Sequence, residues 1–270
     1  MKEIINLPFG ESLKRTFLYL FSHLNQVWRL SLVGIAIIVA ADAALSFPSQ
    51  YTAGETREAW KINLSMLVAT LVTVSVSVAF IRQIVLKSIP TGFPVSFGWR
   101  EAKYFVYNVL ILVMIVILSV ACGVILSLFF GGARELLNQT NMILFLLVIL
   151  TVAVVLSRLC LILPAIAVDN KELTFAKAFD MTKGNSNKIF FGLFLVSFPV
   201  VVILLSVSSF LQEMSVENWA GKLLISTLLA ALTLLNALVK SCFLAHIYQY
   251  FIYFYTPRVE DAQPAKSLLD

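Results

Sequence analysis

Three basic residues stand where an apolar chain rarely keeps a charge. Arg158, Lys240 and Arg82 each interrupt a long apolar run. Arg158 lies about ten residues from the nearer end of its run, roughly 15 Å along a helix. A cation at that depth costs on the order of 3 kcal/mol unless it faces the protein interior, a wet cavity or an anion. We therefore take the three cations as candidate ligands for a lipid phosphate or another anionic headgroup.

Each cation also has a structural interpretation, in which it pairs with a carbonyl, a carboxylate or a headgroup and fixes helix packing. Arg82 lies nearest the end of its run, so its side chain can reach the membrane interface. Pro164 follows Arg158 and predicts a helix kink, because proline removes a backbone hydrogen bond. The kink either opens a cavity beside Arg158 or is an ordinary bend. If Arg158 binds lipid, Arg158→Ala loses an anionic lipid while the protein stays folded.

The other reactive side chains form no metal or catalytic pattern. The cysteines lack CxxC spacing and lie in apolar runs, so we expect buried thiols without disulfides or zinc; they are Cys122, Cys160 and Cys242. His23 and His246 are isolated and are assigned to packing. Asp42 either reaches the interface or serves as an ion ligand. Since GxSxG, HExxH, Walker and GxGxxG motifs are all missing from the sequence, we predict a protein that is not an enzyme and has no cofactor.

The elements that must position these residues are membrane-spanning helices. The chain is 60% hydrophobic and only 13% charged, whereas soluble domains carry about a quarter charged residues. Six apolar runs are long enough to cross a bilayer, which takes about 20 residues. They are 30–47, 64–86, 105–130, 142–168, 189–211 and 223–253. We predict an all-α, polytopic membrane protein with six transmembrane helices, in a single domain over residues 1–270.

The loop charges predict the orientation. Fourteen lysines and arginines fall on the side of the termini and four on the opposite side. Because cytoplasmic loops are enriched in these residues, both termini are predicted to be cytoplasmic. Topology thus explains the net charge of +5, and we expect no binding of nucleic acid.

Three amphipathic stubs suggest an internal repeat. Phe9–Trp28, Phe97–Tyr107 and Leu173–Lys183 carry apolar residues at helical spacing and could lie in the headgroup layer. From the first stub phenylalanine to the cation of the returning span is 73, 61 and 65 residues. We predict tandem hairpin repeats over residues 7–86, 95–168 and 173–255, a tail over 256–270, and pseudo-symmetry about the membrane normal. The three cations would then converge on a shared centre.

One segment carries a family resemblance. The stretch from Arg158 to Pro164, followed by Phe175 to Asn185 with Thr182-Lys183-Gly184-Asn185, resembles six-helix bacterial inner-membrane proteins. These include the membrane domain that accompanies some glycerophosphodiester phosphodiesterases, and related stand-alone proteins. The resemblance implies a bacterial cytoplasmic membrane and a role close to phospholipid. The catalytic domain of such proteins is not in this sequence, so their enzymatic activity is not carried over.

The sequence leads to one main functional prediction and two alternatives. The main prediction is a non-enzymatic inner-membrane protein that binds or moves an anionic phospholipid, or serves as a subunit of an envelope complex. The alternatives are a transporter or channel for a small anionic solute, and a membrane-embedded enzyme acting on lipid headgroups. The expected partners are membrane lipids, anionic phospholipid among them, and another membrane protein.

Overall fold

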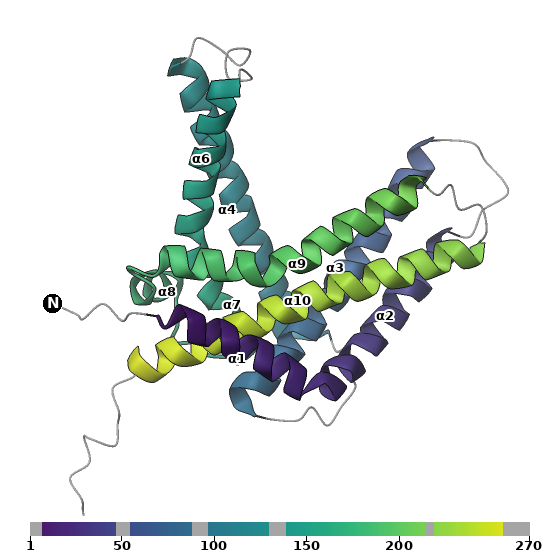
Figure 1. Cartoon of the computed structure of the whole chain (residues 1–270), viewed down its shortest axis with the longest axis horizontal. Helices are drawn as coiled ribbons and strands as arrows, with labels where there is room; N and C mark the ends of the chain where they lie inside the picture. Colours follow the sequence, from purple (N-terminus) through teal and green to yellow (C-terminus); the bar gives the residue numbers. More distant parts are fainter. Residues whose placement is uncertain (1–6, 47–54, 88–96, 130–138, 214–218, 256–270) are drawn as a thin grey trace, which may run out of the picture.

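A computed structural model describes residues 7–46, 55–87, 97–129, 139–213 and 219–255, and all regular structure within these ranges is helical (Figure 1). The first part of the chain forms α1 (Phe9–Ser22), α2 (Leu24–Ser46) and α3 (Glu55–Leu86). The middle forms α4 (Trp99–Phe129), α6 (Gln139–Leu156), the 3₁₀ helix η1 (Ser157–Leu161) and α7 (Ile162–Ala167). The last part forms α8 (Phe175–Met181), α9 (Ser186–Glu213) and α10 (Trp219–Tyr255).

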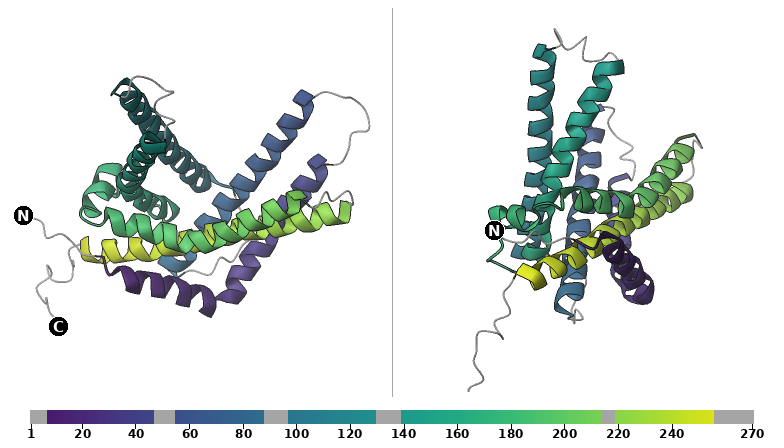
Figure 2. Two further views of the ribbon diagram at one scale, coloured as in Figure 1. Left: turned by 45° about the horizontal axis from the view of Figure 1, so that its top comes forward. Right: turned by 60° about the vertical axis from the view of Figure 1, so that its left-hand side comes forward.

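The prediction of a six-span, all-α membrane protein is confirmed. Six helical segments are long and apolar enough to cross a bilayer: Leu24–Ala44, Leu64–Leu86, Trp99–Ile125, Phe145–Ala167, Ser186–Ser209 and Leu223–Tyr253. Sequence-adjacent spans pack against each other as α2 with α3, α4 with α6, and α9 with α10. With six spans, the start of α1 and the end of α10 fall on one side, and Figure 2 shows them at the same end of the molecule. The repeat and its pseudo-symmetry stay predictions.

The three predicted stubs differ in structure. The first contains the separate helix α1, which buries one face through Ser12, Thr16 and Leu20. Its last residues, from Leu24 to Trp28, belong to the spanning helix α2 instead. The third contains the short helix α8, whose N-cap Thr174 accepts a hydrogen bond from a backbone amide of its first turn. The second is not a separate interfacial helix. Its residues from Trp99 onward form the first turns of α4, because no proline or turn separates them from the span.

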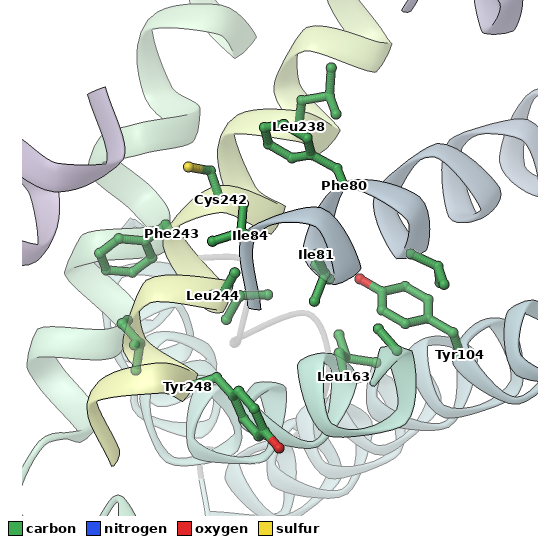
Figure 3. Close-up of a cluster of buried hydrophobic side chains, with 14 of the residues drawn as sticks. Phe80, Ile81, Ile84, Tyr104, Leu163, Leu238, Cys242, Phe243, Leu244 and Tyr248 are labelled. Carbon is green, nitrogen blue, oxygen red and sulfur yellow. The ribbon is translucent and has the colours of Figure 1, made fainter. Parts of the chain in front are cut away.

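Helix α10 lies at the centre and contacts α1, α2, α3 and α9. Its 37 residues extend roughly 55 Å, more than a hydrocarbon core of about 30 Å requires. Phe243 on α10 and Phe80 on α3 are fully buried (Figure 3). Helix α9 comes so close to α10 that a Cβ on Gly192 would lie 1.9 Å from the Phe243 ring. The buried core is therefore built around α10.

The fourth span is interrupted near the predicted kink. Helix α6 ends at Leu156, and the chain continues through η1 before α7 begins. Pro164 in α7 has no N–H to offer the carbonyl one turn earlier, which lies in η1. The tighter 3₁₀ turn is a common response of a helix to such a break. The interruption turns the side chains of η1 toward α8 and α9, with which η1 is in contact.

The hairpin of α4 and α6 diverges from the other four spans (Figures 1 and 2). Helix α4 packs against α3 and α7, and α6 packs against α9. Both helices also contact η1. Within an 18-residue apolar stretch of Trp99–Ile125 only 6% of the residues are buried, against 44% in the corresponding stretch of Leu64–Leu86. Such an exposed apolar helix suits lipid as its surroundings.

Candidate functional site

Arg158, in η1, is occupied by contacts within the protein. Its Nη2 donates to the carbonyl of Phe179, and its Nε donates to Thr182 Oγ1 at 3.3 Å. The guanidinium carbon also lies 3.5 Å from the centre of the Phe179 ring. These contacts join η1 to α8 and its C-cap. The arrangement corresponds to the structural interpretation of Arg158.

Asn185 at the end of the resemblance motif, together with the nearby Lys188, holds the beginning of the described chain. Gly184 has a φ of 82°, a left-handed conformation that favours glycine. Asn185 follows, and its Oδ1 accepts a hydrogen bond of 2.9 Å from the Leu7 amide. The Lys188 ammonium donates to the Leu7 carbonyl at 3.0 Å. Since Leu7 is 1% exposed, the motif fastens a buried segment ahead of α1.

Arg82 lies at a different junction. Its Nη1 donates to the Ala167 carbonyl at 3.1 Å and lies 3.7 Å from the Asp169 carboxylate. Arg100 at the start of α4 forms a second ion pair with Asp169. One carboxylate in the turn after α7 thus joins the end of α3 to the beginning of α4.

Lys240 alone of the three predicted cations lines a cavity inside the membrane-spanning region. The cavity has a volume of about 570 Å³ and lies between α3, α4, α9, α10 and the segment from α6 to α7. Among the residues the structure describes, Lys240 is its only charged lining side chain and has no hydrogen bond or ion pair. Lys240 is thirteen residues from the end of its span at Tyr253, roughly 20 Å along the helix.

The cavity wall divides into a polar strip and an apolar surface. On α10 the strip includes Asn236 and Lys240, one turn apart, and Asn236 Oδ1 is buried without a hydrogen-bond partner among the described residues. Ser157 Oγ and Ser197 Oγ donate to backbone carbonyls and so offer mainly lone pairs to the cavity. The apolar surface includes Val74, Ile115, Leu156, Leu163, Phe190, Leu193, Phe194 and Leu244.

Part of the cavity rim is exposed on the outside of the helix bundle. Asn108 on α4 and Thr233 on α10 are exposed, and Phe194 on α9 is 48% exposed. Tyr104, by contrast, is buried beside Leu163 and Ile81 (Figure 3). The cavity therefore has a closed floor near Tyr104 and an open side within the span, where lipid would surround the protein.

The structure does not bring the three cations into one ring. Lys240 lines the cavity, whereas neither Arg158 nor Arg82 is among its lining residues. Each arginine instead donates to a carbonyl at a junction between helices. The shared centre expected from the repeat is thus reduced, within the described residues, to one lysine.

The remaining candidates have local partners. Asp42 accepts a hydrogen bond of 3.3 Å from Ser65 across α2 and α3. His23 stacks on Tyr19, and His246 Nδ1 bonds the Cys242 carbonyl at 2.8 Å. No group of three or more His, Cys, Asp or Glu side chains that could hold a metal ion occurs in the described ranges.

Sequence reasoning missed two parts of this arrangement. The ion pairs of Asp169 join residues far apart in the chain and left no local signal. Asn236 could have been found, because it precedes Lys240 by four residues on the same helix face. Comparison of the chain with protein-family models, curated proteins and solved structures finds no match.

Proposed function

We propose that this multi-pass membrane protein binds an anionic lipid through Lys240, without acting on it as an enzyme. The observation that carries the proposal is a cavity within the spans whose only charged lining residue, among those described, is an ammonium without a counter-ion. A cation in such a place is costly unless an anion joins it. A lipid phosphate would supply the counter-charge.

The other walls of the cavity fit the remaining parts of a lipid. Asn236 Oδ1 lacks a donor, and leaving a buried acceptor unpaired costs about 1–3 kcal/mol. A headgroup hydroxyl or ammonium would satisfy it. The apolar surface that includes Leu193 and Phe194 suits an acyl chain. The exposed rim at Asn108 and Thr233 offers a path from the surrounding bilayer.

The volume limits how much of a lipid enters. At about 570 Å³ the cavity lies in the range that encloses a drug-sized molecule. A phospholipid with two full chains is larger. The headgroup phosphate and part of one chain would therefore occupy the cavity, while the rest of the lipid stays in the bilayer.

The proposal places the protein in a bacterial inner membrane with both termini in the cytoplasm. It rests on the loop charges and on the resemblance around Arg158. The cavity includes Tyr104 and Phe190, five and four residues from the starts of their spans on the side of the termini. In that orientation the cavity serves the cytoplasmic leaflet.

Native mass spectrometry of the purified protein with phosphatidylglycerol and phosphatidylcholine tests the proposal. Wild type should retain the anionic lipid in preference to the zwitterionic one. Lys240→Met keeps the volume of the side chain and removes its charge, so the preference should disappear. Lys171→Met, at an exposed lysine outside the cavity, is the matched control. Equal phosphatidylglycerol adducts in wild type and Lys240→Met would rule the proposal out.

A further inference from the structure

A second cavity, separate from the Lys240 cavity, lies at the end of the bundle where the chain termini fall. Its volume is about 410 Å³, and its walls come from α1, the start of α2, the end of α3 and the last third of α10. Seven of its eight lining residues are polar, and none of these described residues is a carboxylate. They are Tyr19, His23, Gln26, Gln83, Lys87, His246 and Gln249. Such a lining suits a water-soluble group.

The internal hydrogen bonds define which atoms remain for a ligand. Gln83 Nε2 donates to Gln26 Oε1, and Gln249 Nε2 donates to the Ile84 carbonyl at 3.0 Å. Gln83 and Gln249 thus keep an acceptor oxygen, and Gln26 keeps its NH₂ donor. The amide side chains alone offer a ligand both acceptors and a donor.

The two histidines add acceptors. His23 Nδ1 lies 3.1 Å from the Tyr19 carbonyl, and His246 Nδ1 lies 2.8 Å from the Cys242 carbonyl. A carbonyl only accepts, so His246 Nδ1 carries the proton and its Nε2 is an acceptor when the ring is neutral. His23 Nδ1 also lies 2.8 Å from the Ser22 hydroxyl, so the neutral His23 ring accepts at Nδ1 in one tautomer and at Nε2 in the other. Tyr19 lies between them, stacked on His23 and edge-on to His246. Burial raises the pKa of Tyr19, so its hydroxyl remains a donor at neutral pH.

Lys87 supplies the only charge among the described lining residues. It is the residue after α3 and has a φ of 53°, in the left-handed region. A side chain other than glycine costs roughly 1 kcal/mol there, and glycine is usual at this position. Glycine would avoid this conformational cost but has no side chain. Lysine at this position places a cation at the cavity.

We infer that this second cavity binds a small phosphate-bearing anion that also carries hydroxyl groups. The phosphate pairs with Lys87 and Gln26. The hydroxyl groups donate to the glutamine oxygens and to Nε2 of His246. The same chemistry occurs in a soluble sugar phosphate and in a hydroxylated lipid headgroup.

Isothermal titration of the full chain in detergent with glucose 6-phosphate tests the inference, with glucose and inorganic phosphate as comparison probes. Glucose 6-phosphate should bind at least tenfold more tightly than either, because each comparison probe lacks one half of the recognised chemistry. Lys87→Asn keeps a residue that tolerates the left-handed conformation and should weaken binding at least tenfold. Lys171→Asn should leave the affinity unchanged.

Three results would overturn the inference: no measurable binding of glucose 6-phosphate, equal affinity for glucose, or unchanged affinity in Lys87→Asn. Unchanged affinity together with a lower melting temperature would show that the Lys87 cation stabilises the C-terminus of α3 and does not bind the anion. Repeating the titration in nanodiscs with phosphatidylinositol distinguishes the two sources. Competition by this lipid identifies a headgroup site, and its absence identifies a site for a soluble anion.

Discussion

Arg158 and Lys240 are both basic residues inside apolar spans, yet their surroundings differ in kind. The Arg158 guanidinium is planar and has several donors, so it serves a backbone carbonyl, a threonine hydroxyl and an aromatic ring together. Lys240 has a single ammonium on a flexible stem and no hydrogen-bond partner among the described residues. We therefore assign Arg158 to stability and propose Lys240 as the cation that binds a ligand.

Arg158→Ala should lower the free energy of unfolding by about 3 kcal/mol. The change leaves the Phe179 carbonyl without its charged donor, and hydrogen bonds to charged groups are each worth about 1.5–3 kcal/mol. Thermal or denaturant unfolding in detergent measures the loss. Arg15→Ala, at an exposed pair with Glu11 on α1, is the control and should cost less than about 1 kcal/mol. An equal loss in both variants would contradict the structural role of Arg158.

Asp169→Asn should weaken the junction of α3 and α4 by a smaller amount, about 1 kcal/mol. Both of its ion pairs are partly exposed, with side-chain exposures of 29% for Arg82 and 48% for Arg100, so solvent screens them. The stability difference from wild type should shrink as salt rises from 0.05 to about 0.5 M. A difference independent of salt would show that Asp169 acts through something other than charge.

At the scale of elements, close packing around α10 depends on one small residue. Gly192→Ala places a methyl group into the Phe243 ring, which is fully buried where α9 packs against α10. We expect a loss of about 1–3 kcal/mol in the free energy of unfolding, as for other overpacked cores. Gly10→Ala, in α1 with open space around it, should be neutral or slightly stabilising. Equal melting temperatures for Gly192→Ala and wild type would refute the close approach of α9 and α10.

The elements were also the most predictable part of the chain. Length and hydropathy suffice for a membrane span, so the predicted runs 64–86 and 223–253 coincide with apolar segments of α3 and α10. The helices themselves begin earlier, at Glu55 and Trp219. The second stub was mistaken for an interfacial helix, because an amphipathic pattern does not reveal whether a helix continues into a span. The site was less predictable. Arg158, Arg82 and Lys240 each interrupt an apolar run, and position in the run separated only Arg82. Tertiary contacts were needed to distinguish Arg158 from Lys240.

At the scale of the whole molecule, the distribution of basic residues predicts both termini in the cytoplasm. Fusions of a periplasm-active phosphatase and of a fluorescent protein to the C-terminus, expressed in a bacterium, measure this. The fluorescent fusion should be bright and the phosphatase fusion inactive. A control phosphatase fusion made after residue 134, in the connection between α4 and α6, should be active. The reverse pattern would refute the orientation, and with it the assignment of the Lys240 cavity to the cytoplasmic leaflet.

The α4 and α6 hairpin diverges from the other spans (Figure 1), and residues of both helices line the Lys240 cavity. The central claim is that an anionic lipid fills this cavity with its phosphate at Lys240. The most direct measurement is an electron cryo-microscopy map of the protein in nanodiscs containing phosphatidylglycerol. We predict continuous density from the Lys240 ammonium, past Asn236, to the rim between Asn108 and Phe194. A cavity that holds only water, or that α4 and α6 close against α9 without any lipid, would contradict the account.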